Sequence, residues 1–207
     1  MRSFTSQKQI LLGTDYCSVL QWVMQSNLFP HSRLPHVTGP HSPIHGGMSR
    51  SIQEHALATI ADSETPLEIR YKICNLEQEM FKLADHYTEL PTEHLFAPQV
   101  YLRKVWLQKG HTYVGKIHRH EHANIVSSGL IAVVTEFEPY TVYRGHCMFL
   151  SPPHTKRALV ALEDTVWTCI HTNPENITDL DELEDYNIAK SYTELGMEDP
   201  MLLIGRN

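Results

Sequence analysis

The stretch Gly115-Lys116-Ile117-His118-Arg119-His120-Glu121-His122 places three histidines at alternate positions, just before a run of strand-like sequence. In an extended strand, alternate side chains point to the same face and lie about 6 to 7 Å apart. Imidazoles on one face can close on a single cation through bonds of about 2.1 Å. We therefore predict His118, His120 and His122 as metal ligands. The alternative is that they are polar residues at the mouth of a barrel that holds no metal.

Beyond residue 99 the chain consists of short strand-like runs separated by turn residues. We expect seven or eight strands, at 100–107, 113–118, 124–127, 130–137, 140–143, 147–150, 157–162 and 166–171. Parallel pairing would need longer crossover connections than these turns allow. The pattern therefore predicts a compact antiparallel barrel or jelly roll, so the fold class is mainly β.

The first half of the chain has a helical pattern instead. Helices are expected at 14–26, 50–61 and 65–83, and a further C-terminal helix at 179–195. The third begins with Thr65-Pro66-Leu67-Glu68, which is a capping box with proline at the first helical position. Its apolar stripe is expected to pack on the barrel or on a second subunit.

Between the first two helices, Pro-His recurs every five residues within residues 29–47. Histidine-rich tracts can bind metals, but the proline and glycine content favours an extended arm or linker. The expected organisation is a helical extension at 1–95 that includes this linker, a barrel at 96–174, and a C-terminal helix and tail at 175–207.

Composition narrows the functional classes. The 207 residues are 42% hydrophobic and 20% charged, as in an ordinary soluble globular protein. A formal charge of −7 argues against nucleic acid as a partner, because nucleic-acid binders concentrate Lys and Arg. Four cysteines without a CxxC pair favour a reducing, cytoplasmic setting. No apolar run is long enough to span a membrane, and the N-terminus lacks a secretory apolar core.

The region around the histidines resembles the cupin superfamily, whose fold is a jelly-roll barrel. His118 and His120 match the histidine pair of the first cupin motif, and Gly129 matches its closing glycine. The place of the motif's glutamate falls on His122 after a shortened gap. Glu121 is the carboxylate alternative, but strand alternation would point it away from the histidines.

The second cupin motif is matched only loosely, by Gly145 and Pro152. Its histidine position falls on Arg157 and its asparagine position on Ala161, so the resemblance supplies no fourth ligand there. His154, three residues earlier, and His171, at the end of the last expected strand, are candidate replacements.

A narrower resemblance, to small cupin-like proteins encoded by bacteriophages, covers residues 93–172. It is carried by the segments His94-Leu95-Phe96-Ala97, Gly115-Lys116-Ile117-His118, Glu121-His122-Ala123-Asn124-Ile125, Thr155-Lys156-Arg157 and Glu163-Asp164-Thr165-Val166-Trp167-Thr168-Cys169-Ile170-His171. This resemblance implies a fold rather than a reaction.

A cluster of neutral imidazoles suits Fe, Mn, Ni or Zn as a divalent cofactor. Such a metal could polarise a substrate oxygen or activate water or O₂. Arg157 would then suit a substrate carboxylate or phosphate, with an ion pair at a surface or interface as its alternative role. Trp167 and Tyr113 could line an apolar pocket, although core packing is the favoured role for residues of this kind.

The leading functional hypothesis is therefore a metal-binding protein that acts on or senses a small molecule, in the cytoplasm of an infected host cell if it is encoded by a phage. The rival is a non-catalytic assembly protein of a virion that uses the barrel as a scaffold. An inhibitor directed at the host is a third class. Under the first two hypotheses we expect a homo-oligomer, because an amphipathic helix and edge strands need to be covered.

Overall fold

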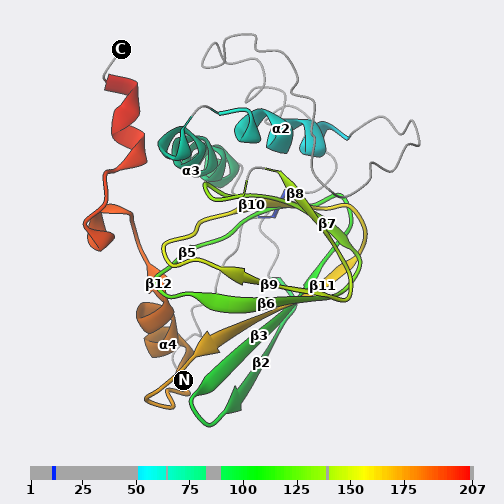
Figure 1. Ribbon diagram of the computed structural model, residues 1–207, viewed down its shortest axis with the longest axis vertical. Coiled ribbons are helices and arrows are strands. Elements are labelled where there is room, and N and C mark those ends of the chain that lie inside the picture. Colours follow the sequence, from blue (N-terminus) through cyan, green and yellow to red (C-terminus); the bar gives the residue numbers. More distant parts are fainter. Residues whose placement is uncertain (1–10, 13–50, 64, 83–89, 139, 206–207) are drawn as a thin grey trace.

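The computed structural model describes residues 11–12, 51–63, 65–82, 90–138 and 140–205. The predicted helix at 14–26 and the Pro-His segment at 29–47 lie outside these residues. In the described part, two sheets face each other and helices lie along one side and one end (Figure 1).

Both large sheets are antiparallel throughout. The first has the order β1 (Leu11–Leu12), β4 (Thr112–Val114), β10 (Ala158–Ala161), β7 (Leu130–Val134) and β8 (Thr141–Arg144). The second has the order β2 (Thr92–Ala97), β3 (Val100–Leu107), β11 (Thr165–Thr172), β6 (His122–Ser128) and β9 (Cys147–Ser151). Strands distant in sequence are neighbours in both sheets, which confirms the predicted antiparallel jelly roll.

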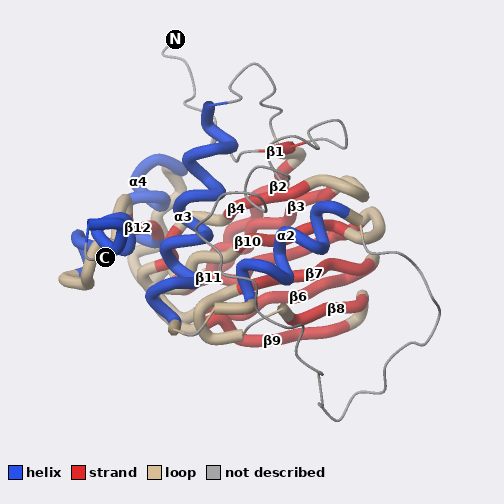
Figure 2. Tube along the Cα trace, turned by 90° about the horizontal axis from the view of Figure 1, so that it is seen from above, coloured by secondary structure: helices blue, strands red, loops and turns tan. Residues whose placement is uncertain are grey.

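Apolar side chains fill the space between the two sheets. Those of Val126, Ile131, Leu159 and Trp167 come from both sheets and are almost completely buried. Strands β7 and β10 are buried on both faces, because helices cover the outer side of their sheet (Figure 2). This double burial explains why both strands read as continuous apolar runs in the sequence.

The covering helices are α2 (Ile52–Ala61) and α3 (Pro66–Lys82). The predicted capping box of α3 is present: the Glu68 amide donates to Thr65 Oγ1 and the Thr65 amide donates to Glu68 Oε2. The apolar stripe of α3 packs on Val134, Ala158 and other residues of the barrel. The stripe therefore covers the barrel, which was one of the two packing partners expected.

The C-terminal helix is shorter than the predicted 179–195. Helix α4 (Leu180–Asn187) is capped by Asp179 and ends where β12 (Ile188–Ala189) pairs with β5 (Ile117–His118). Backbone groups of β12 that pair with β5 are not available to continue the hydrogen bonds of a longer helix. The short helices η2 (Thr193–Leu195) and η3 (Pro200–Gly205) follow. No helix among the described residues is long and apolar enough to cross a membrane.

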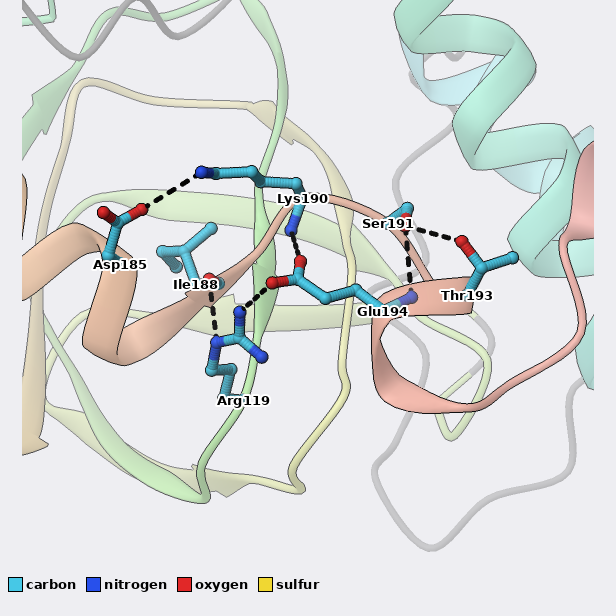
Figure 3. A network of polar contacts seen from close by, with 7 residues as sticks. All are labelled: Arg119, Asp185, Ile188, Lys190, Ser191, Thr193 and Glu194. Carbon is cyan, nitrogen blue, oxygen red and sulfur yellow. Dashed lines mark hydrogen bonds and ion pairs between the residues drawn. The ribbon is translucent and has the colours of Figure 1, made fainter.

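A polar network fixes the segment after α4 (Figure 3). Arg119 Nε donates to the Ile188 carbonyl at 3.0 Å, and the Arg119 guanidinium also pairs with Glu194. The other Glu194 carboxylate oxygen accepts from the Lys190 amide at 2.7 Å. Because Arg119 directly follows β5, this network ties the C-terminal segment to the strand that carries His118.

Candidate metal centre and adjoining cavity

Three of the predicted histidines come together at one end of the barrel. His118 ends β5, His122 begins β6 and His171 lies near the end of β11. One ring nitrogen of each lies within 4.8 Å of the others. The ring centroids are 4.2 Å apart for His118 and His122, and 4.8 Å apart for His122 and His171. This is the arrangement expected of side chains that can share one cation.

Local strand geometry explains how these three residues meet. In β11 the residues Trp167, Cys169 and His171 alternate with more exposed neighbours, so that they share the inward face. The chain between β5 and β6 bends at residues 119–121 instead of continuing as one strand. The bend lets His118 and His122 face each other from the ends of two strands.

The same bend separates His120 from the group. The structure places the His120 ring against Tyr186, with ring centroids 4.9 Å apart, and not beside the other three. The expectation of strict alternation from 118 to 122 is therefore wrong for the middle position. Glu121 is exposed and is not among the grouped ligand atoms.

His154 also lies outside the group of three. It occupies a turn with a positive φ of 66°, and its amide donates to the His118 carbonyl at 2.6 Å. Its backbone thus supports the position of His118, while its ring is not among the grouped ligand atoms.

Arg157 lies next to the histidines and is only 4% exposed. Its guanidinium donates to Ser151 Oγ at 2.7 Å and to Asn124 Oδ1 at 3.3 Å. The same nitrogen that reaches Ser151 is 3.3 Å from His122 Nε2. All three partners are uncharged, and none of the ion pairs among the described residues includes Arg157.

Asn124 is fully buried on β6 and forms hydrogen bonds with several residues beside the histidines. Its side-chain oxygen accepts from Trp167 Nε1 at 3.0 Å as well as from Arg157. Its side-chain nitrogen donates to Ser151 Oγ at 2.9 Å. The guanidinium of Arg157 also lies over the Trp167 ring, 5.4 Å from its centroid. These contacts hold Arg157 in one place.

The environment keeps all three imidazoles neutral. Burial, with a smaller effect of the nearby Arg157 charge, lowers the pKa of His122 to about 3. Burial, followed by Arg103, lowers the pKa of His171 to about 4. The pKa of His118 is also well below its usual value, chiefly through burial. Neutral imidazoles have the lone pairs that metal coordination requires.

The donor set fits a divalent transition metal, with one competing interaction. His122 Nδ1 faces the His120 carbonyl at 3.3 Å and so carries the proton, which leaves the Nε2 lone pair to accept from Arg157. The buried Nδ1 of His118 has no hydrogen-bond partner among the described residues. A metal at His122 Nε2 would replace the Arg157 hydrogen bond, because one lone pair cannot serve both.

A cavity of about 80 Å³ adjoins the centre. His118, His171 and Arg157 lie in its wall, together with the predicted pocket residues Trp167 and Tyr113. The Tyr113 hydroxyl accepts from the Gln108 amide at 2.9 Å, so its polar end is already bonded to the backbone. Helix α4 closes one side of the cavity with Leu180, Leu183, Glu184 and Asn187.

Several polar residues of the site were not predicted from the sequence. Asn124 and Ser151 stand at inward positions of β6 and β9, and Tyr101 and Arg103 come from β3. An asparagine at an inward strand position is a recognisable pattern, since a buried amide needs partners. The local sequence does not indicate Ser151 as a site residue, because its place in the site depends on the pairing of β9 with β6.

Comparison with known proteins gave matches among solved structures. Neither the family models nor the curated proteins searched include a match to it. Among solved structures, a RmlC-like cupin from Shewanella frigidimarina is 24% identical over 41% of this chain and 76% of its own, with a TM-score of 0.36. KdgF from Halomonas sp. is 22% identical over 41% of this chain and 80% of its own, also with a TM-score of 0.36.

A third structure is a RmlC-like cupin family protein with a double-stranded β-helix fold from Methanocaldococcus jannaschii. It is 13% identical over 42% of this chain and 83% of its own, with a TM-score of 0.36. The likeness concerns the fold alone and assigns neither a ligand nor a reaction.

Proposed function

We propose that this protein binds a divalent transition metal through His118, His122 and His171, and a small molecule in the adjoining cavity. The observation that carries the proposal is the convergence of three neutral imidazoles, with ligand atoms within 4.8 Å of one another, two of which, His118 and His171, lie in the wall of that cavity. Three imidazole ligands suit Fe, Mn, Ni or Zn alike.

A bound metal would supply a Lewis acid that polarises an oxygen of the small molecule. The chain's own contribution is to place and shield the ligand. Apolar side chains such as Val105, Leu159 and Trp167 line the cavity, and α4 closes one side of it. Asn124 and Ser151 hold Arg157 beside the histidines.

The test is metal analysis of protein purified without a histidine tag, before and after reconstitution with each metal. We expect close to one equivalent of metal in the wild-type protein. The substitution His122→Gln removes one of three ligands. It should lower the metal affinity by at least about 10- to 100-fold, because the loss of a mere hydrogen-bond partner of a metal ligand already has an effect of this size. The matched control is His120→Gln, which changes a histidine two residues away and should leave metal content unchanged.

Two results would contradict the proposal. One is wild-type protein that holds no transition metal after reconstitution. The other is equal loss of metal in the two variants, which would point to metal held elsewhere, for instance by histidines outside the described residues.

The second candidate function is a non-catalytic assembly protein, including a component of a phage virion. The observation that favours it is the apolar outer face of the second sheet, where Leu95, Met148 and Leu150 are 59%, 79% and 60% exposed. Exposed apolar surface of this kind suits protein contacts. Stoichiometric copies of the chain in purified particles would support this function, and its absence from them would count against it.

A further inference from the structure

Arg157 has a feature that the metal centre does not explain. A guanidinium that is almost completely buried usually has a carboxylate partner, because an uncompensated buried charge costs several kcal/mol. Arg157 is 4% exposed, and its three hydrogen bonds go to a histidine, a serine and an asparagine. These bonds occupy three of its five N–H groups, and Nε is buried without a partner in the described part of the chain.

The cavity beside Arg157 has the same imbalance of charge. The charged residues of its wall include Arg157, Lys116 and Glu184. Lys116 and Glu184 pair with each other. A metal at the three histidines would add further positive charge a few ångströms from Arg157 and would make the imbalance larger.

We propose that the cavity binds a small organic anion, with its charged end at Arg157 and its apolar body against Val105, Leu159 and Trp167. This inference rests on the proposed function in that it names the class of the small molecule. An anion at this position compensates the buried guanidinium, and also the metal when one is bound. The remainder of the wall is mostly aliphatic and aromatic, which excludes a strongly hydrated polyanion that lacks an apolar part.

Gly115 contributes to this arrangement. A Cβ at this position would lie 3.2 Å from Arg157 Cγ, which is tighter than ordinary packing. The Gly115 amide also donates to the Arg157 carbonyl at 2.8 Å. Gly115 therefore leaves the space in which the Arg157 side chain runs along the cavity wall.

The first experiment needs no variant. Full-length protein, either treated with chelator or loaded with metal, is titrated calorimetrically with propionate, with the neutral isostere propionamide, and with inorganic phosphate and methyl phosphate. We expect millimolar or tighter binding of propionate or methyl phosphate, and binding of neither propionamide nor inorganic phosphate. Binding of propionate alone assigns a carboxylate, and binding of methyl phosphate alone assigns a phosphate ester. Equal binding of propionate and propionamide, binding of inorganic phosphate alone, or no binding of any anion would overturn the inference.

The second experiment tests the role of Arg157. Arg157→Gln should weaken binding of the anion by about 10- to 100-fold, as expected for a hydrogen-bonded charge. Arg144→Gln is the matched control, because Arg144 is an exposed arginine on β8 and should leave the affinity unchanged. Gly115→Ala should give a smaller loss, because it displaces the Arg157 side chain without removing its charge.

Metal content separates this inference from the proposed function. Arg157→Gln should bind metal as tightly as the wild-type protein or more tightly, since it removes a nearby positive charge and a competing hydrogen bond. Anion binding that needs Arg157 in chelator-treated protein would support the inference even if no metal binds. Anion binding that needs the metal and is the same in Arg157→Gln would overturn it and leave the proposed function standing.

Discussion

Gly129, in the turn between β6 and β7, shows how closely single residues are constrained in this barrel. Its φ is +89°, and a Cβ there would lie 2.6 Å from Thr165 Cα. A left-handed conformation costs a residue with a side chain about 1 to 2 kcal/mol, and overpacking costs about 1 to 3 kcal/mol more. We expect Gly129→Ala to lower the free energy of unfolding by about 2 to 5 kcal/mol in urea denaturation.

Gly196 is the control for this prediction. Its φ is +70°, but a Cβ would meet nothing within 4 Å. Gly196→Ala should therefore cost only the conformational part, about 1 to 2 kcal/mol. Similar losses in the two variants would show that the close approach of Gly129 to β11 does not contribute.

Only some residues of the candidate site could be predicted from the sequence. His118 and His122 were identified from their spacing, and His171 from its place at the end of a strand. The prediction that alternate spacing places His120 beside the other two histidines was wrong, because a bend replaces the strand at residues 119–121. Arg157 was found only by its position in the resemblance. Its neutral partners Asn124 and Ser151 come from other strands, and strand pairing cannot be read from local sequence.

Among the elements, α4 has the clearest structural role, since it closes the cavity. Leu183 points from α4 into the cavity wall and is 2% exposed. Leu183→Ala removes buried methyl groups and should lower the free energy of unfolding by about 2 to 4 kcal/mol. It should also enlarge the cavity, which can be checked by tighter binding of longer carboxylates. Leu202→Ala, at a leucine that is 62% exposed, should change stability by less than about 0.5 kcal/mol.

The attachment of α4 and β12 to the barrel depends on Arg119. Arg119→Gln removes the pair with Glu194 and weakens the bond to the Ile188 carbonyl. Because the Arg119 and Glu194 side chains are 25% and 38% exposed, water screens the pair and we expect only a small loss of stability. Hydrogen exchange should speed up at Ile188 and Ala189 and stay unchanged in β3 and β11.

Lys190→Gln provides the comparison for Arg119. Lys190 pairs with Asp185 at 3.4 Å, and both side chains are largely exposed (Figure 3). Its removal should leave exchange in β12 unaltered, since the Lys190 amide still donates to Glu194. Equal acceleration in the two variants would mean that general charge loss, rather than the Arg119 contacts, loosens the segment.

Most of the elements could be predicted because their patterns are local. Helix α3 shows its capping box and stripe, and strands β3 and β11 lie within two residues of their predicted bounds. Strand β2 was missed, because Pro91 and the polar residues Glu93 and His94 hide its pattern and its pairing with β3 is what stabilises it. The C-terminal helix was predicted too long, because its end is set by the distant strand β5.

At the scale of the whole molecule, the outer surface of the second sheet is unusually apolar. Pairing between strands aligns one row across all five, which consists of Leu95, Leu102, Ile170, Ala123 and Leu150. Met148 and Trp106 lie on the same face and are 79% and 39% exposed. The stripe of α3, in contrast, is already covered by the barrel. In the described part of the chain, this sheet face therefore offers an exposed apolar surface for association.

The expected homo-oligomer stays a prediction, and the row across the sheet provides its test. Light scattering and sedimentation at micromolar concentration should give a mass larger than the 23.8 kDa of one chain. Leu150→Lys places a charge within the row, where desolvation would cost several kcal/mol, and should shift the protein to monomer. Phe137→Lys changes another exposed apolar residue, in the turn after β7, and should leave the mass unchanged. A monomeric wild-type protein, or equal dissociation of the two variants, would rule out association through this face.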